Sequence, residues 1–174
     1  TGVMSIKLGP KRSKINMCTL LRALGYNSND DILNLFRDVK FNPNQVNIIE
    51  ATLAKDPTNS TPAAIFDIYN RMRPDVTASL ENAKQYIESL LFDPQRTYLG
   101  DVGRYQFNKK LNEKYKRELN EDNYKFFASD LIGIIERLLD VNYGNQMPDD
   151  TDHLGNRRIR RVNELLGEVV YAAI

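Results

Sequence analysis

The sequence predicts a mainly α-helical chain with a minor β component, folded as an irregular helical domain. Apolar residues recur at helical spacing through most of the chain, and glycine or proline follows several of these stretches. Only residues 3–8 and 96–107 have patterns that could form strands. A chain of 174 residues is long enough for one domain with a small appendage, and it can bury a core without disulfides.

The first half of the chain contains the clearest helix boundaries. Residues 17–24 are apolar at helical spacing, and Gly25 is a natural stop after them. Ser28, with Asp31 three positions later, predicts the start of a second short helix. The pairs Asn42-Pro43 and Thr61-Pro62 each place an N-cap residue before a proline, so both predict helix starts.

The second half of the chain predicts three more helices. The first begins near residue 77 or 79 and is stopped by Pro94. Helical spacing then breaks up over residues 95–105, where Gly100 and Gly103 suggest turns or short extended pieces. The strongest amphipathic pattern covers residues 121–141. A polar loop at 142–150 separates it from a last helix, predicted to start near residue 155 or 156.

Composition limits the classes of function. The net charge is +1, with 24 basic and 23 acidic residues, so contact with DNA has to come from local clusters. The single cysteine, Cys18, permits no internal disulfide and suits a reducing compartment. It lies in an apolar run, which favours a buried structural thiol over a reactive one. No apolar stretch is long enough for a membrane span and no secretory signal is visible, so we expect a cytoplasmic protein without a membrane partner.

Residue types that support catalysis or metal binding are scarce. His153 is the only histidine, so it cannot form a zinc set or a nucleophilic pair with the distant Cys18. Phosphate-binding glycine loops are missing from the sequence. The acidic run at 149–152 lacks the glycine and the distant glutamate of a calcium loop. We therefore expect no catalysis by the chain alone and no cofactor held by it.

Charge is concentrated at residues 149–161, where three aspartates are followed by four arginines. If a helix starts near residue 156, Ile159, Val162 and Leu166 define its inner face. The arginines then occupy its first turns, where the helix dipole disfavours them, and an outer face suited to phosphate oxygens. The alternative is a solvated helix start whose arginines pair with the neighbouring acids. Two other basic clusters, at residues 7–14 and 109–117, are expected to be solvated.

The same segment carries a family resemblance. Asp-His-Leu-Gly-Asn-Arg-Arg-Ile-Arg at residues 152–160 resembles a signature of the β subunit of bacterial RNA polymerase. Further stretches resemble that subunit in the same order, and together they cover most of residues 14–166. They are Leu-Leu-Arg-Ala-Leu-Gly-Tyr at 20–26, Arg-Met-Arg-Pro at 71–74, Leu-Phe-Asp-Pro-Gln-Arg at 91–96 and Val-Gly-Arg-Tyr at 102–105.

The resemblance implies a piece of the β subunit with a supporting role. It assigns residues 1–150 to the lobe (β2) region and residues 151–174 to the start of the return segment into the protrusion (β1). In this family the lobe lines the downstream DNA channel and contacts the non-template strand of the transcription bubble. The implied partners are DNA, the other polymerase subunits, σ factor and transcription factors. The catalytic magnesium is held by another subunit, and the implied location is the cytoplasm, associated with the nucleoid.

The resemblance also implies DNA-binding residues. Asp152 matches the acid that reads an unpaired guanine of the non-template strand, and Arg157 matches an arginine of the same pocket. Thr151 holds a neighbouring position that is usually isoleucine. Arg158 and Arg160 match the signature and are assigned phosphate contacts.

The match is not uniform. Lys11 and Arg12 resemble a basic stretch before the first helix and are candidate DNA contacts, although Pro10 replaces a usual acid there. Residues 167–174 leave the family pattern, for which an engineered end, a divergent lineage and a phage-like subunit are all open explanations. A helical module that docks transcription factors is the alternative function, with the face around residues 98–105 as its candidate surface.

Overall fold

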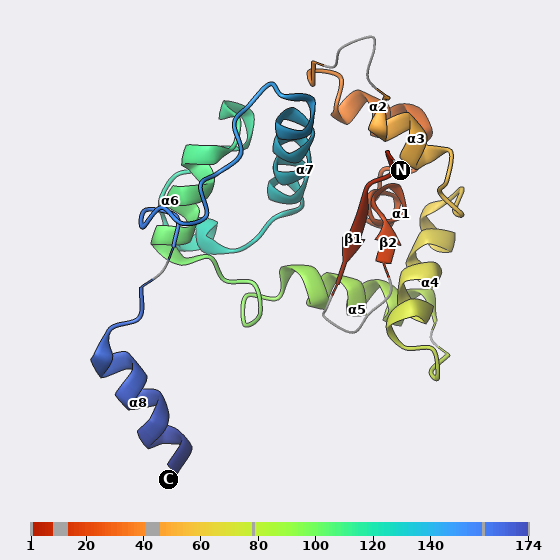
Figure 1. The fold of residues 1–174 in the computed structure, drawn as a ribbon. Helices are drawn as coiled ribbons and strands as arrows, with labels where there is room; N and C mark the ends of the chain where they lie inside the picture. The colour runs from red at the N-terminus through yellow and green to blue at the C-terminus, as the bar shows by residue number, and fades with distance from the viewer. Residues whose placement is uncertain (1, 9–13, 41–45, 78, 158, 174) are drawn as a thin grey trace.

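The computed structural model describes residues 2–8, 14–40, 46–77, 79–157 and 159–173, and it is mainly helical with one small sheet, as predicted (Figure 1). The elements are, in chain order, β1 (Ser5–Lys7), β2 (Lys14–Asn16), α1 (Met17–Ala23), α2 (Asn29–Leu35), α3 (Ile48–Leu53), α4 (Thr61–Met72), α5 (Leu80–Phe92), α6 (Gly100–Lys110), the 3-10 helices η1 (Glu113–Tyr115) and η2 (Glu121–Tyr124), α7 (Ala128–Tyr143) and α8 (Val162–Ala173).

Helix α1 is the centre of the first half. It follows β2, which pairs antiparallel with β1 so that Ile6 lies opposite Ile15. Residues 17–22 of α1 are all buried. One side of α1 packs in a core with α2, α3 and α7, whereas Leu20 belongs to a second core with α4 and α5. A short helix buried on all sides thus joins two hydrophobic clusters.

The helix boundaries of the first half largely follow the sequence prediction. Ser28 caps α2 in a reciprocal arrangement with Asp31, as expected. Helix α4 begins at Thr61 with Ser60 as its N-cap, one residue earlier than predicted. Asn42-Pro43 lies outside the described residues, and α3 begins later, with Asn47 as its N-cap.

A buried ion pair organises the second half. Arg104 of α6 and Asp130 of α7 both have fully buried side chains, and their charged groups are 2.8 Å apart. The Arg104 guanidinium also donates to the backbone carbonyls of Asn123 at 2.6 Å and Lys125 at 2.5 Å. Asp130 accepts a further hydrogen bond from the backbone N–H of Phe127, at the start of α7. These contacts fix α6, the connecting segment and α7 relative to one another.

The prediction of turns or strands around residues 96–107 is wrong. Helix α6 occupies most of that range, and the extended structure there is a single bridge between Tyr98 and Lys125. Gly100 starts the helix with a left-handed φ of 67°. Arg104 faces inward, so the sequence shows a polar residue where a helix would normally show an apolar one. These two features hide the amphipathic pattern.

The predicted helix over 121–141 is two elements. Residues 121–124 form η2, and α7 begins only at Ala128, where the Asp130 carboxylate receives the Phe127 N–H. The helix ends at Tyr143, and the residue that caps it, Gly144, adopts a left-handed φ of 80°. The apolar periodicity predicted this helix correctly, but its first residue is determined by the hydrogen bond between the Phe127 N–H and the buried Asp130 carboxylate.

The basic cluster at 109–117 is not simply solvated, contrary to expectation. Lys114 lies 3.0 Å from the buried carboxylate of Glu136, which also accepts hydrogen bonds from Tyr115 and Asn112. The Arg117 guanidinium stacks over the ring of Phe127 at 4.0 Å. These side chains secure η1 and the residues on either side of it against α7.

The thiol of Cys18 is fully buried, as predicted. Burial, and secondarily the nearby carboxylate of Asp56, raises the pKa of this thiol to about 12. Asp56 itself is held by Arg22 and Thr19, each at 2.8 Å. Because nucleophilic reactivity needs the thiolate, Cys18 is an inert part of the core at neutral pH.

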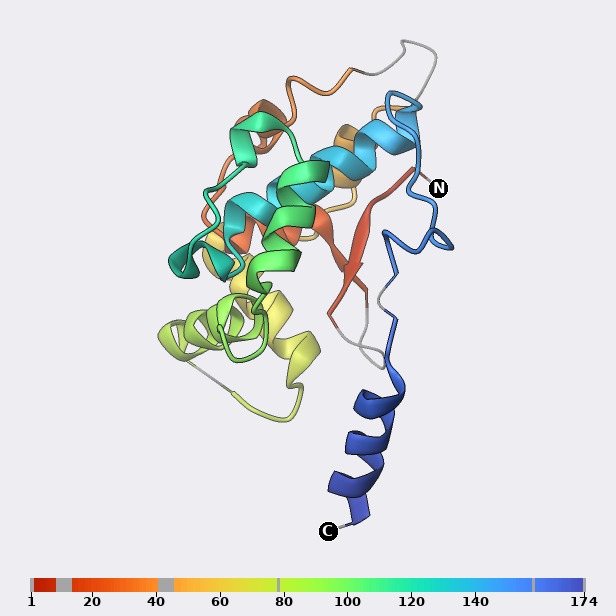
Figure 2. The same ribbon diagram turned by 90° about the vertical axis from the view of Figure 1, so that its left-hand side faces the viewer.

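Helix α8 extends away from the rest of the molecule in both views (Figures 1 and 2). Its apolar side chains are exposed, namely Val162, Leu165, Leu166, Val169 and Val170. The prediction that Ile159, Val162 and Leu166 form an inner face is therefore wrong, because nothing described in the chain packs over them. No helix among the described ranges is both long and apolar enough to cross a bilayer.

We predict that Arg104→Met lowers the free energy of unfolding by about 3–5 kcal/mol, because it leaves the Asp130 carboxylate buried and unpaired. Urea denaturation followed by circular dichroism measures this. The double variant Arg104→Met/Asp130→Asn removes the stranded charge and is expected to recover part of the loss. A cost of less than about 1 kcal/mol for Arg104→Met would contradict an organising role for the pair.

Candidate nucleic-acid interface

The arginine-rich segment is not a helix start. Residues 154–156 form a turn, residues 159–161 have no regular secondary structure, and α8 begins only at Val162. The prediction of a helix from residue 155 or 156 is thus wrong. The apolar spacing that suggested it reflects exposed side chains, so no core contact holds those residues in a helix. The helix-dipole argument for the arginines no longer applies.

Residues 150–157 form a loop held by its own polar groups. The backbone N–H of Asp152 donates to the Asp150 carboxylate at 2.9 Å. The Asn156 side chain donates to the backbone carbonyl of Asp150, also at 2.9 Å, and its backbone N–H donates to the carbonyl of His153 at 2.8 Å. The His153 ring nitrogen Nδ1 accepts from the Gly155 N–H at 3.0 Å. Asp150, His153 and Asn156 thus have local structural roles.

The structure brings two of the predicted site residues together. A guanidinium nitrogen of Arg157 lies 3.8 Å from a carboxylate oxygen of Asp152, and the two side chains are 68% and 90% exposed. Such an exposed pair contributes about 0–1 kcal/mol. Opening it for an incoming base therefore costs little. The loop presents an acceptor and a donor side by side to the solvent.

The remaining predicted residues are more scattered. Thr151 is exposed next to Asp152 in the same loop. Arg160 pairs with Glu168 of α8 at 2.9 Å, so its partner in this exposed contact is an acid outside the predicted run. Lys11, Arg12 and Arg158 lie outside the described residues. The alternative in which arginines pair with the local acids holds for Arg157 but not for Arg160.

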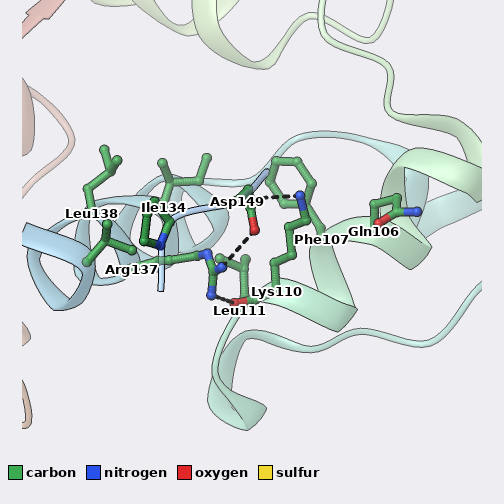
Figure 3. Close-up of a pocket in the computed structure, with 10 residues that line it drawn as sticks. Gln106, Phe107, Lys110, Leu111, Ile134, Arg137, Leu138 and Asp149 are labelled. Atoms are coloured by element: carbon green, nitrogen blue, oxygen red, sulfur yellow. Dashed lines mark hydrogen bonds and ion pairs between the residues drawn. The ribbon is translucent and has the colours of Figure 1, made fainter. Parts of the chain in front are cut away.

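An ionic cluster ties the base of the loop to the helical body. The carboxylate of Asp149 lies 2.8 Å from Lys110 Nζ at the end of α6 and 3.1 Å from an Arg137 guanidinium nitrogen in α7 (Figure 3). Arg137 also donates to the backbone carbonyl of Lys110 at 3.0 Å and to the Gln146 side chain at 2.5 Å. The hydrogen bond from Lys110 holds the pKa of Asp149 below its usual value. Asp149 is therefore ionised at neutral pH.

A cavity of about 410 Å³ adjoins this cluster between α6 and α7 (Figure 3). Its walls are mainly apolar, with Phe107, Ile134 and Leu138 from the two helices, Leu111 just after α6 and Pro148 from the loop base. Lys110, Arg137 and Asp149 lie at its polar side. Pro148 therefore packs at an apolar surface immediately before the charged anchor.

Sequence reasoning assigned Asp149 to the acidic run but missed its partners. Lys110 and Arg137 are 39 and 12 positions away in sequence, and neither spacing is a helical or hairpin signal. Within the described ranges, no group of three or more His, Cys, Asp or Glu side chains is arranged to bind a metal ion.

Comparisons with known proteins give a consistent result. A family model described as RNA polymerase Rpb2, domain 2 matches residues 2–160. The DNA-directed RNA polymerase subunit beta of Dehalococcoides mccartyi (strain CBDB1) is 44% identical over 165 residues, which cover 94% of this chain and 13% of that protein. The protein of the same name from Chloroflexus aggregans is 36% identical over 192 residues, covering 94% of this chain and 15% of that protein. The chain thus spans only a small part of the length of these relatives.

We predict that trypsin cleaves the native protein first after Arg157, Arg160 or Arg161. These residues are exposed and lie outside helices, so the chain can enter a protease there without unfolding a core. Limited digestion followed by mass spectrometry identifies the sites. Arg137 is a matched internal site within α7 and should be cut much later. Early cleavage after Arg137 would show that α7 opens more readily than its packing indicates.

Proposed function

Because this chain belongs to the β-subunit family of DNA-directed RNA polymerases, we propose that it is a non-catalytic module lining the downstream DNA channel of the assembled enzyme. In this role it contacts the non-template strand of the transcription bubble. Nucleotidyl transfer takes place elsewhere in the assembly, with magnesium held by another subunit. The observation that carries the proposal is the exposed pair of Asp152 and Arg157 on a structured loop.

The chemistry of the pair suits an unpaired guanine. A carboxylate accepts hydrogen bonds only, and the Watson–Crick edge of guanine offers two donors, the ring N1–H and the exocyclic amine. Adenine presents an acceptor at N1, so it would meet the Asp152 carboxylate unfavourably. Asp152 is almost entirely exposed and only loosely paired, so a base can reach it. Thr151, beside it, would face the base or its sugar.

The arginines of the segment supply the sequence-independent part of binding. Arg157 at the end of the loop and Arg160 after it are both exposed, and guanidinium groups suit phosphate oxygens. Arg158, Lys11 and Arg12 remain proposed phosphate contacts from the resemblance. With a net charge of +1, the chain alone would neutralise few phosphates and bind DNA weakly. Base reading would require the assembled polymerase, which holds the bubble open.

A second function, docking of σ factor or transcription factors, is favoured by one surface. Val102 and Tyr105 are one turn apart on α6, and Tyr98 precedes them; all three are more than half exposed. Large apolar side chains grouped on a surface often mark a protein contact. This role is compatible with DNA binding, because the Asp152 loop belongs to a different segment.

We predict that Asp152→Ala in the full-length subunit of a reconstituted polymerase abolishes a preference for guanine over adenine at the downstream non-template position. The loss should be about 1–3 kcal/mol in relative affinity, as for a good bidentate base contact. Affinity for forked DNA of each kind, measured by fluorescence anisotropy, gives the preference. Equal treatment of the two bases by wild type and variant would reduce Asp152 to a structural residue of its loop.

For phosphate contacts, we predict that Arg157→Ala and Arg160→Ala weaken binding to all sequences and each reduce the salt slope of log K by about 1. Titration at several salt concentrations measures the slope. Arg71→Ala is a suitable control, because this arginine pairs with Asp67 within α4 and lies outside the proposed interface. A slope that stays at the wild-type value in both segment variants would rule out a phosphate role for these residues.

A further inference from the structure

We propose that Asp149, clamped by Lys110 and Arg137, is the positioning residue that holds Asp152 in place for reading the base. The proposal rests on the proposed function of Asp152. It adds that guanine preference depends on an ionic contact between Asp149 and the helices α6 and α7. This contact does not involve the base or the Asp152–Arg157 pair.

The loop needs such an anchor because burial does not supply one. All residues from 147 to 157 are exposed, and residues 159–161, which precede α8, are exposed as well. The internal hydrogen bonds around Asp150 give the loop a shape, but they do not attach it to the body. Asp149 is the residue immediately before this loop, and its carboxylate bonds to two helices at once.

The clamp has the features of a rigid contact. Arg137 is only 23% exposed, and its guanidinium connects Asp149 with Gln146 and with the last carbonyl of α6. The chain between α7 and Asp149 is also restrained, because the backbone N–H groups of Asn145 and Gln146 both donate to the carbonyl of Asp140. Charge-assisted, forked contacts of this kind fix direction as well as distance.

The distance from the clamp to the reading group is short. Asp152 is three residues beyond Asp149, a span of at most about 11 Å of extended chain. A small displacement of Asp149 is therefore expected to displace the Asp152 carboxylate by a similar distance. Because recognition of a base edge depends on hydrogen-bond distances and angles, a displacement of about 1 Å would weaken it markedly.

The first test uses Asp149→Asn in the full-length subunit of the reconstituted polymerase. This variant keeps the side-chain shape but removes the charge that holds Lys110 and Arg137. We expect the guanine preference to fall by about tenfold, equivalent to about 1.4 kcal/mol, while the affinity for adenine-bearing DNA and its salt slope stay close to wild type. A role confined to folding or phosphate binding would instead change the affinity for both DNAs alike. Asp122→Asn is the matched control, since Asp122 is exposed in η2.

The second test asks whether the residues act through one another. Lys110→Met should lower the preference, whereas Lys109→Met, which removes the exposed neighbouring charge, should not. The double variant Asp149→Asn/Lys110→Met should be no worse than the more affected single variant, because Asp149→Asn already removes the contact with Lys110. Strictly additive losses would mean that the two side chains do not cooperate, and would overturn the clamp.

Hydrogen exchange of a peptide covering residues 150–157 separates this inference from the proposed function. The N–H groups of Asp152, Gly155 and Asn156 are bonded within the loop, so their exchange reports its order. Faster exchange in Asp149→Asn, together with a lost preference, supports the clamp. If Asp152→Ala loses the preference and Asp149→Asn retains it, the proposed function stands and the clamp is overturned. If wild type shows no preference, the proposed function fails, and unchanged exchange in Asp149→Asn would overturn the clamp as well.

Discussion

The arrangement of the second half depends on the burial of one charged pair. Arg104 and Asp130 place charged groups in the interior, where an uncompensated charge is costly. The donors of Arg104 and the acceptors of Asp130 therefore need hydrogen-bond partners within the protein. Arg104 meets this requirement by reaching the carbonyls of the segment between α6 and α7. This demand leaves the two helices little freedom to slide past each other. The last residue of α6 is then set beside the middle of α7, with Lys110 next to Arg137.

The candidate interface combines a restrained base with an exposed tip. The base belongs to the helical body through Asp149, whereas Asp152 and Arg157 lie in solvent with only a loose contact between them. This division suits recognition of a flexible single strand. In the proposed role, Asp152 and Arg157 would leave each other at little cost in free energy, and the attachment of the loop to the helical body would set the direction in which they point. The module would then impose a geometric requirement on the DNA that it is proposed to contact.

The sequence predicted those parts of the fold that depend on local signals. The capping box at Ser28 and the proline near the start of α4 were found because cap chemistry acts within one turn. Helix α6 was missed because Arg104 occupies a core position, and α8 was started too early because Ile159 has helical spacing without a core to pack on. The site residues in the loop were predicted from the resemblance of residues 152–160 to a family signature. The partners of Asp149 could not be predicted, because they are brought together only by tertiary packing.

The burial of Cys18 makes this chain convenient for spectroscopy. It is the only cysteine in the sequence, and its thiol is shielded from solvent and held in the neutral form. A new cysteine placed at an exposed position, such as Thr151, would therefore be the only thiol in the chain that a maleimide or nitroxide label reaches in the folded state. The native residue need not be replaced first, so the two cores that meet at α1 can be left untouched while a probe is attached to the loop.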